Sequence, residues 1–171
     1  IEIRPARLAD AVGIARVHVK SWRETYRGLL PDGVLDAMSV PGKAAMWSAT
    51  LRTERRDRPV FVAVAGHRIV GFASGGPRRG RVLRHDGEVY TLYLARDWQG
   101  QGAGRRLLRA VAGRLNEAGA RSLCIWVLVS NDAARDFYEH IGGDMCAAQP
   151  FEMGGRIDTE VAYGWPDIAA L

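Results

Sequence analysis

The stretch from Trp98 to Leu108, WQGQGAGRRLL, places three glycines at alternating positions directly before a run with helical spacing. Glycine inside regular structure costs about 1 kcal/mol relative to alanine, so local stability does not explain the three together. The preceding segment, EVYTLYLA at 88–95, has the pattern of a strand, and the following residues predict an amphipathic helix that ends near Gly119. A strand, a glycine-rich turn and a helix with unpaired N–H groups is typical of phosphate binding.

Two familiar phosphate loops do not match this turn. A Walker loop needs Lys-Ser or Lys-Thr after its last glycine, and Arg105-Arg106 follow here. A dinucleotide fingerprint G-x-G-x-x-G starting at Gly100 or Gly102 needs glycine at Arg105 or Leu107. A turn tightened only for packing remains an alternative.

The rest of the chain predicts a mixed order of helices and strands. In chain order, the predicted elements are a strand at 1–4, a helix at 8–28, a helix at about 41–53, a β-hairpin at 59–76 that turns at Gly66-His67, the strand at 88–95, the helix ending near Gly119, a buried strand at 121–129, a short helix at 131–143, and strands at about 144–151 and 156–163. This order favours one mixed α/β sheet with helices on both faces.

Length and hydropathy favour a single compact domain over residues 1–171. The chain is 47% apolar, yet no apolar stretch approaches the ~20 residues of a membrane span. The N-terminus lacks the basic-then-apolar layout of a secretory signal. The sequence begins at Ile1 rather than Met, which is consistent with removal of an initial residue or short leader. We therefore expect a cytoplasmic protein with no membrane partner.

Net charge and the spacing of cysteine and histidine residues limit the classes of ligand that we expect. The net charge is +5, which suits nucleic acid, an acidic membrane or a phosphorylated ligand. The chain lacks interleaved aromatic residues and any helix-turn-helix or ribonucleoprotein signature, so we expect no nucleic-acid partner. Cys124 and Cys146 have no C-x-x-C spacing, and we expect buried thiols. The four histidines lack metal-ligand spacing, and we expect no metal.

Three blocks of sequence resemble the GNAT superfamily of N-acetyltransferases. Gln99, Gly102 and Gly104 match the Q/R-x-x-G-x-G/A pattern of that family's pyrophosphate loop. EVYTLYL at 88–94 is similar to its fourth strand, and NDAARDFYEHIGG at 131–143 is similar to its N-x-x-A-x-x-F-Y-x-x-x-G segment. The blocks cover about a third of the chain, in register. Gly143 is a departure, because many relatives carry an aromatic residue there.

The resemblance implies a GNAT fold and an acetyl-CoA-dependent N-acetyltransferase. The fold would be a seven-stranded, largely antiparallel sheet that splays between its fourth and fifth strands to admit acetyl-CoA. Acetyl would pass directly to a primary amine of a small molecule or a peptide, without a covalent enzyme intermediate. The alternative is a non-catalytic acyl-CoA-binding or sensor protein of the same fold. A homodimer is compatible with either activity.

The resemblance also assigns a coenzyme site. The backbone of residues 99–104 would cradle the pyrophosphate, and Arg105 and Arg106 would either add positive charge or form a solvated helix face. Asn131 would bond the pantetheine arm or simply cap a helix. The full set implied to bind the coenzyme is Leu92, Tyr93, Leu94, Gln99, Gly100, Gln101, Gly102, Ala103, Gly104, Arg105, Asn131 and Tyr138. Within it, the Leu94 amide would face the thioester carbonyl.

Acetyl transfer needs a proton acceptor and a hydrogen-bond donor. A lysine-like amine has a pKa of ~10.4, so freeing its lone pair at pH 7 costs roughly 4.6 kcal/mol. Glu88 is our candidate base, because the resemblance implies that a glutamate at this offset of the GNAT strand takes the amine proton, directly or through water. Strand alternation would place Glu88 on one face with Tyr90, Leu92 and Leu94. A surface carboxylate at a strand entrance is the alternative.

Tyr138 is our candidate donor to the leaving thiolate, because it matches the tyrosine that the family places near the coenzyme sulfur. The alternative is a core residue, since Tyr138 belongs to an apolar helical stripe with Ala134, Phe137 and Ile141.

The first predicted helix supplies candidates for the acceptor site. His18, Trp22 and Tyr26 lie four residues apart, and in the GNAT fold the first helices wall the acceptor. We name Trp22, Tyr26 and Glu88 as substrate-binding candidates. An aromatic stripe at this spacing is also typical of a core. Possible anions for a cationic amine are Glu24, Asp32 and Asp36.

Overall fold

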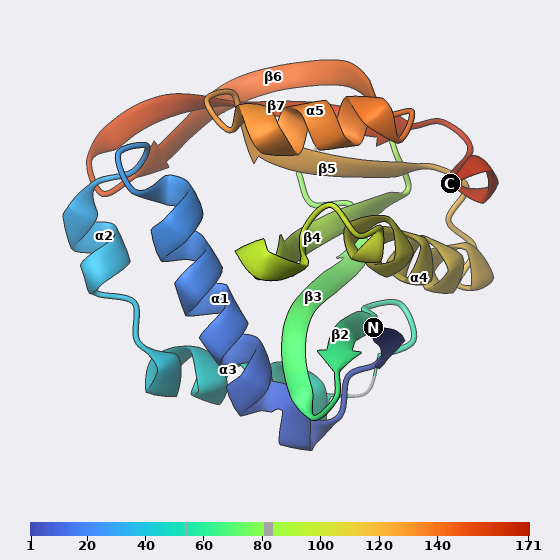
Figure 1. Ribbon diagram of the computed structural model, residues 1–171. Helices are drawn as coiled ribbons and strands as arrows, with labels where there is room; N and C mark the ends of the chain where they lie inside the picture. The colour runs from blue at the N-terminus through green and yellow to red at the C-terminus, as the bar shows by residue number, and fades with distance from the viewer. Residues whose placement is uncertain (54, 81–83) are drawn as a thin grey trace.

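The computed structural model describes residues 1–53, 55–80 and 84–171. Seven strands pair into one sheet in the order β1-β2-β3-β4-β5-β7-β6, and every neighbouring pair is antiparallel except β4 with β5. The strands are β1 (Glu2–Pro5), β2 (Val60–Ala65), β3 (Arg68–Pro77), β4 (Gly87–Leu94), β5 (Leu123–Leu128), β6 (Asp144–Met153) and β7 (Arg156–Trp165). The predicted seven-stranded, largely antiparallel sheet is confirmed (Figure 1).

Helices cover both faces of this sheet (Figure 1). They are α1 (Ala11–Tyr26), α2 (Asp32–Asp36), α3 (Val40–Arg52), α4 (Ala103–Glu117) and α5 (Asp132–His140), with short 3-10 helices η1 (Leu8–Asp10), η2 (Arg96–Trp98) and η3 (Ile168–Ala170). One apolar cluster joins α1 and α3 to Val62 and Phe72, and a second joins α4 and Tyr138 of α5 to Val89 and Ala73. The two faces therefore have separate cores. Within the described residues, no helix is both long and apolar enough to cross a membrane.

The first predicted helix is shorter than expected. Leu8–Asp10 forms a 3-10 turn, α1 then runs to Tyr26, and Gly28 follows with a φ of +82°. The five-residue helix α2 was not predicted, because so short an element carries too little apolar periodicity.

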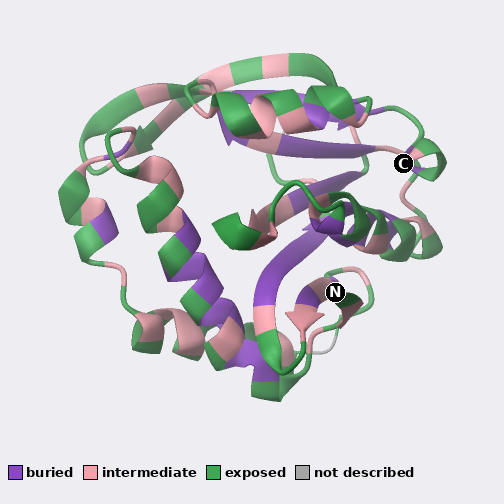
Figure 2. Ribbon diagram, viewed as in Figure 1, coloured by how far each residue is buried: buried purple, intermediate pink, exposed green. Residues whose placement is uncertain are grey.

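The prediction of two buried thiols is right for Cys124 and wrong for Cys146, which is exposed. Cys146 lies on β6, and β6 is an edge strand that pairs only with β7. All residues of β6 are exposed or half-buried (Figure 2). A strand pattern alone does not distinguish an edge strand from a central one.

A buried histidine joins α1 to α3 and to the sheet. The His18 Nδ1 accepts a hydrogen bond from Trp47 Nε1 at 3.1 Å, and the His18 ring stacks on Tyr93 of β4 at 5.5 Å. His18 is 5% exposed. Its burial, with a smaller contribution from the Lys43 charge, lowers the pKa of His18 to about 4.

We expect this histidine to make the fold acid-sensitive. Below pH 6.5 the unfolded chain protonates His18 and the folded chain does not, so its contribution to stability is complete above pH 6.5 and is lost as the pH falls toward 4. Between pH 7 and pH 5 the loss amounts to about 2 kcal/mol. His18→Gln keeps an acceptor for Trp47 but does not titrate. Chemical denaturation at both pH values should show a smaller acid loss in the variant; equal losses would contradict this assignment.

Candidate active site

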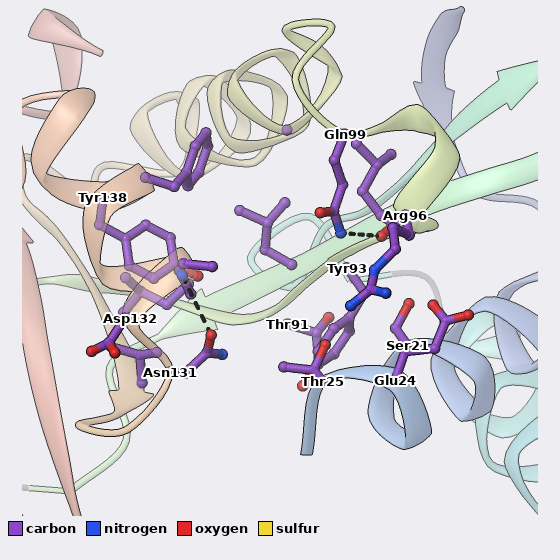
Figure 3. Close-up of a pocket in the computed structure, with 18 of the residues that line it drawn as sticks. Ser21, Glu24, Thr25, Thr91, Tyr93, Arg96, Gln99, Asn131, Asp132 and Tyr138 are labelled. Atoms are coloured by element: carbon purple, nitrogen blue, oxygen red, sulfur yellow. Dashed lines mark hydrogen bonds between the residues drawn. The ribbon is translucent and has the colours of Figure 1, made fainter. Parts of the chain in front are cut away.

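A cavity of about 850 Å³ opens where β4 leaves β5 (Figure 3). The two strands, both fully described, pair at only three positions, from Gly87 with Leu123 to Val89 with Ile125. Beyond Val89, β4 still pairs with β3 on one side, but its other edge borders the cavity and no longer pairs with β5. The cavity therefore offers a strand edge whose backbone groups can pair with an extended ligand.

A β-bulge at Tyr90 sets the direction of the β4 side chains. Ser74 pairs with Thr91 and Gly75 pairs with Val89, so Tyr90 is the extra residue. Val89, Leu92 and Leu94 accordingly pack on the α4 face, and Tyr93 packs on the α1 face. The prediction that Glu88, Tyr90, Leu92 and Leu94 share one face is wrong, because the bulge shifts the alternation by one residue.

Two of the three glycines in the turn are required by its backbone conformation. Gly100 and Gly102 have φ angles of +72° and +77°, in the left-handed region that L side chains rarely adopt. An added Cβ at either position would meet no protein atom within 4 Å, so the space around them is open. Gly104 has ordinary backbone and lies against Phe137, where an added Cβ would sit 3.4 Å from the ring. The turn thus brings the first amides of α4 to the cavity without side chains in front of them.

The other predicted loop residues divide into two groups. Gln99, Gly100, Gly102, Gly104 and Arg105 line the cavity. Gln99 also donates from Nε2 to the Leu94 carbonyl at 2.9 Å, which ties the loop to the end of β4.

Three neighbouring side chains do not line the cavity. Gln101 bonds the Asp97 carbonyl at 3.2 Å, and Ala103 is buried. Arg106 donates to the Ile1 carbonyl at 2.9 Å. The structure therefore favours Arg105 over Arg106 as a partner for a bound phosphate.

Asn131, the N-cap of α5, and Tyr138, in the last turn of α5, lie on the opposite wall (Figure 3). The Asn131 Oδ1 accepts a hydrogen bond from the Ala134 amide at 3.3 Å, so Asn131 caps the helix and also lines the cavity. Tyr138 is 5% exposed and packs against Phe137, Tyr163 and Trp165. Burial raises the pKa of Tyr138, which keeps its hydroxyl protonated. Tyr138 is thus a core residue that also lines the cavity.

Glu88 is held by Arg79, which the sequence did not indicate. The Arg79 amide donates to Glu88 Oε2 at 2.8 Å, and its guanidinium donates to Oε1 at 3.0 Å from Nε and 2.5 Å from Nη2. The same guanidinium lies 4.2 Å from the centre of the Tyr90 ring, and Tyr90 lines the cavity. Glu88 is 1% exposed and does not itself line the cavity. Its carboxylate can reach an acceptor amine only if this ion pair opens.

Residues of α1 and β4 line the side of the cavity where we expect the acceptor. Tyr26 is among them, but Trp22 is not, because Trp22 donates to the Tyr93 hydroxyl at 2.9 Å and faces Lys43 of α3. Ser21 and Thr25, one helical turn apart, take the position on the cavity wall.

Sequence reasoning missed Ser21, Thr25, Thr91 and Arg96. The four-residue spacing of Ser21 and Thr25 beside the aromatic stripe was the available signal. Asp32 and Asp36 pair with Arg27, away from the cavity, whereas Glu24 lines it. In the part of the chain that the structure describes, no cluster of three His, Cys, Asp or Glu side chains could hold a metal ion.

We expect Gly102→Val to abolish the stabilisation that acetyl-CoA gives the folded protein. Acetyl-CoA at ~100 times its dissociation constant should add ~2.7 kcal/mol, measured as a rise in the thermal midpoint. Valine at a left-handed position costs about 1–2 kcal/mol and turns the loop away from its binding conformation. Gly66→Val is the matched control, because Gly66 also has a positive φ of +59° and open space, but lies in the β2–β3 turn. The control should lose stability and keep the acetyl-CoA shift; loss of the shift in both variants, or in neither, would contradict the loop assignment.

Comparison with known proteins identifies a family. The model of the acetyltransferase (GNAT) family matches residues 19–143. An uncharacterized N-acetyltransferase, YuaI from Bacillus subtilis, is 37% identical over 100% of this chain and 96% of its own. The N-alpha-acetyltransferase 30 of Schizosaccharomyces pombe is 31% identical over 48% of this chain and 55% of its own.

Solved structures show the same fold at low sequence identity. A ribosomal-protein-alanine N-acetyltransferase from Brucella melitensis has a TM-score of 0.73 at 22% identity, covering 96% of this chain and 99% of its own. The PaiA N-acetyltransferase from Thermoplasma acidophilum, solved with coenzyme A, has a TM-score of 0.71 at 18% identity, covering 96% and 98%. The family match and the full-length similarity to the Bacillus protein show that this chain belongs to the GNAT family of acetyltransferases.

Proposed function

We propose that this enzyme moves the acetyl group of acetyl-CoA directly to a primary amine of a small molecule or peptide, at the opening between β4 and β5. One observation carries the proposal: a single cavity joins the glycine loop on one side to the polar wall of α1 on the other. Donor and acceptor can therefore meet without a covalent enzyme intermediate. Acetyl-CoA supplies the activated thioester as the cosubstrate.

Three parts of the coenzyme would each have their own contacts on this chain. The β4 backbone at residues 92–94, which has no strand partner on the cavity side, would pair with the extended pantetheine arm. The Leu94 amide would face the thioester carbonyl and stabilise the developing oxyanion. The α4 amides behind Gly102, with Arg105, would hold the pyrophosphate. The open space at Gly100 and Gly102 supports this placement.

Tyr138 would donate a hydrogen bond to the coenzyme sulfur as the thiolate leaves. An ordinary phenol has a pKa of about 10 and an ordinary thiol about 8.5, and burial raises the pKa of Tyr138 further. Complete proton transfer is therefore uphill. Hydrogen-bond donation to the developing thiolate is the role that this environment supports.

We expect Tyr138→Phe to lower kcat for acetyl transfer about 10- to 100-fold, because it removes this donor and leaves the ring in place. The dissociation constant for acetyl-CoA should change less than about threefold. Tyr163→Phe is the control, since the Tyr163 hydroxyl bonds Glu139 and Arg135 outside the cavity. Release of coenzyme A and the mass of the acetylated product, measured over a panel of primary amines, check the result. A parent protein that binds acetyl-CoA and acetylates no amine would favour the sensor alternative.

Glu88 would accept the amine proton, directly or through a water molecule, once Arg79 moves away. Its place on β4, next to the point where β4 and β5 separate, supports this role. Its ion pair with Arg79 adds a requirement, because a carboxylate that accepts three hydrogen bonds from one residue must lose some of them first. Arg79 is 64% exposed at its side chain, so it has room to move into solvent.

Glu88→Gln and Arg79→Met separate a base from a structural anchor. If Glu88 is the base, Glu88→Gln should lower kcat about 100-fold. Arg79→Met should keep at least the parent kcat, because it releases the Glu88 carboxylate from the Arg79 guanidinium. Steady-state kinetics at pH 7, with a thermal midpoint for each variant, check this. Equal losses of kcat and stability in both variants would instead make Glu88 an anchor for Arg79.

A further inference from the structure

The acceptor wall contains a buried hydroxyl with no partner. Ser21 is 5% exposed, and its Oγ makes no hydrogen bond with any group that the structure describes. Ser21 lines the cavity from the middle of α1, beside Glu24 and one turn before Thr25 (Figure 3). A buried hydroxyl without a partner is costly in a folded protein, so its persistence at a cavity wall points to a ligand group that bonds it.

A positive charge without a partner lies on the same wall. Arg96 follows β4 in η2 and lines the cavity, and in the view of Figure 3 its guanidinium points toward α1. Within residues 1–53, 55–80 and 84–171, its side chain forms no ion pair or hydrogen bond. A guanidinium is always charged and presents a planar set of donors that matches a carboxylate.

The acidic residues on the cavity wall already have basic partners. Glu24 pairs with Lys20 at 3.7 Å, and Asp132, on the α5 side, pairs with Arg135 at 3.5 Å. Arg105, the other arginine at the cavity, belongs to the glycine loop. Arg96 therefore gives the acceptor side a positive charge that these carboxylates do not balance.

We propose that the acceptor is a primary amine that carries a carboxylate on the same small molecule, as free amino acids do. The carboxylate accepts hydrogen bonds from the Arg96 guanidinium and the Ser21 hydroxyl, and the amine is left to face the opening between β4 and β5. The proposal rests on the acetyl transfer proposed above and narrows its acceptor. It disfavours a peptide N-terminus, in which an uncharged amide replaces the neighbouring carboxylate.

Matched acceptors test this directly. Each member of a panel of amino acids, short ω-amino acids included, is compared with its own carboxamide, which has the same shape without the negative charge. For at least one pair, the parent enzyme should show a kcat/KM at least tenfold higher for the acid. Arg96→Met should reduce that preference to less than about threefold by slowing the acid alone, and Ser21→Ala should reduce it by a smaller factor. Arg16→Met, on an exposed part of α1 outside this cavity, should keep the full preference.

Three outcomes would overturn the proposal. The first is a parent enzyme that acetylates every carboxamide as well as its acid. The second is an Arg96→Met variant in which the KM for acetyl-CoA rises by the same factor as kcat/KM for the acid falls. That result would make Arg96 a coenzyme contact. The third is an Arg96→Met protein of unchanged thermal midpoint that keeps the preference for the acid.

Binding separates this proposal from the proposed activity. Isothermal titration of the coenzyme-A-loaded protein with the same pairs requires no turnover. If no amine is acetylated but the acid binds at least tenfold more tightly than its amide, and Arg96→Met removes that difference, the carboxylate site stands and the transferase proposal fails. If neither acids nor amides bind or react, the carboxylate site is wrong.

Discussion

The separation of β4 from β5 is the constraint on which the rest of this structure depends. Two parallel strands that remained paired along their length would satisfy each other's backbone groups and leave no opening. Here pairing lasts for three positions and then stops at the Tyr90 bulge. The bulge is fixed on its other side, where Thr91 and Ser74 share a hydrogen bond of 2.7 Å across β3 and β4. Beyond the bulge, the β4 backbone groups on the cavity side must form hydrogen bonds with water or with a ligand.

The bulge also decides which chemistry meets which face. On the α4 face, Leu92 and Leu94 pack on the side of the glycine loop. There the amides at the start of α4 and the Arg105 side chain provide positive charge. On the α1 face, Tyr93 is held by Trp22 and His18, so the proposed acceptor wall lies beside an aromatic cluster. Proposed donor and acceptor sites are thus two faces of one strand. The cavity beside β4 connects the two proposed sites.

The sequence predicted the coenzyme side better than the acceptor side, and the reason is physical. Gln99, Gly102 and Tyr138 lie in continuous motifs, and the structure brings them to one cavity. Their assigned chemical roles remain predictions. The prediction for the face of Glu88 was wrong because it assumed strict alternation, whereas the bulge inserts an extra residue. The bulge arises from the pairing of β4 with β3, which the sequence of β4 alone does not show. Arg79 was missed because its contact with Glu88 depends on how the chain returns after β3.

Helical spacing pointed to α1, which does line the cavity, but of the two residues named on it Tyr26 reaches the cavity and Trp22 does not. Trp22 is drawn toward α3 and Tyr93, and this leaves Ser21 and Thr25 at the cavity. The most direct test of the whole account is a crystal structure of the protein with acetyl-CoA. We expect the pantetheine arm along residues 92–94 of β4, with the pyrophosphate at the amides that follow Gly102. A coenzyme ordered anywhere other than the opening between β4 and β5 would contradict the account.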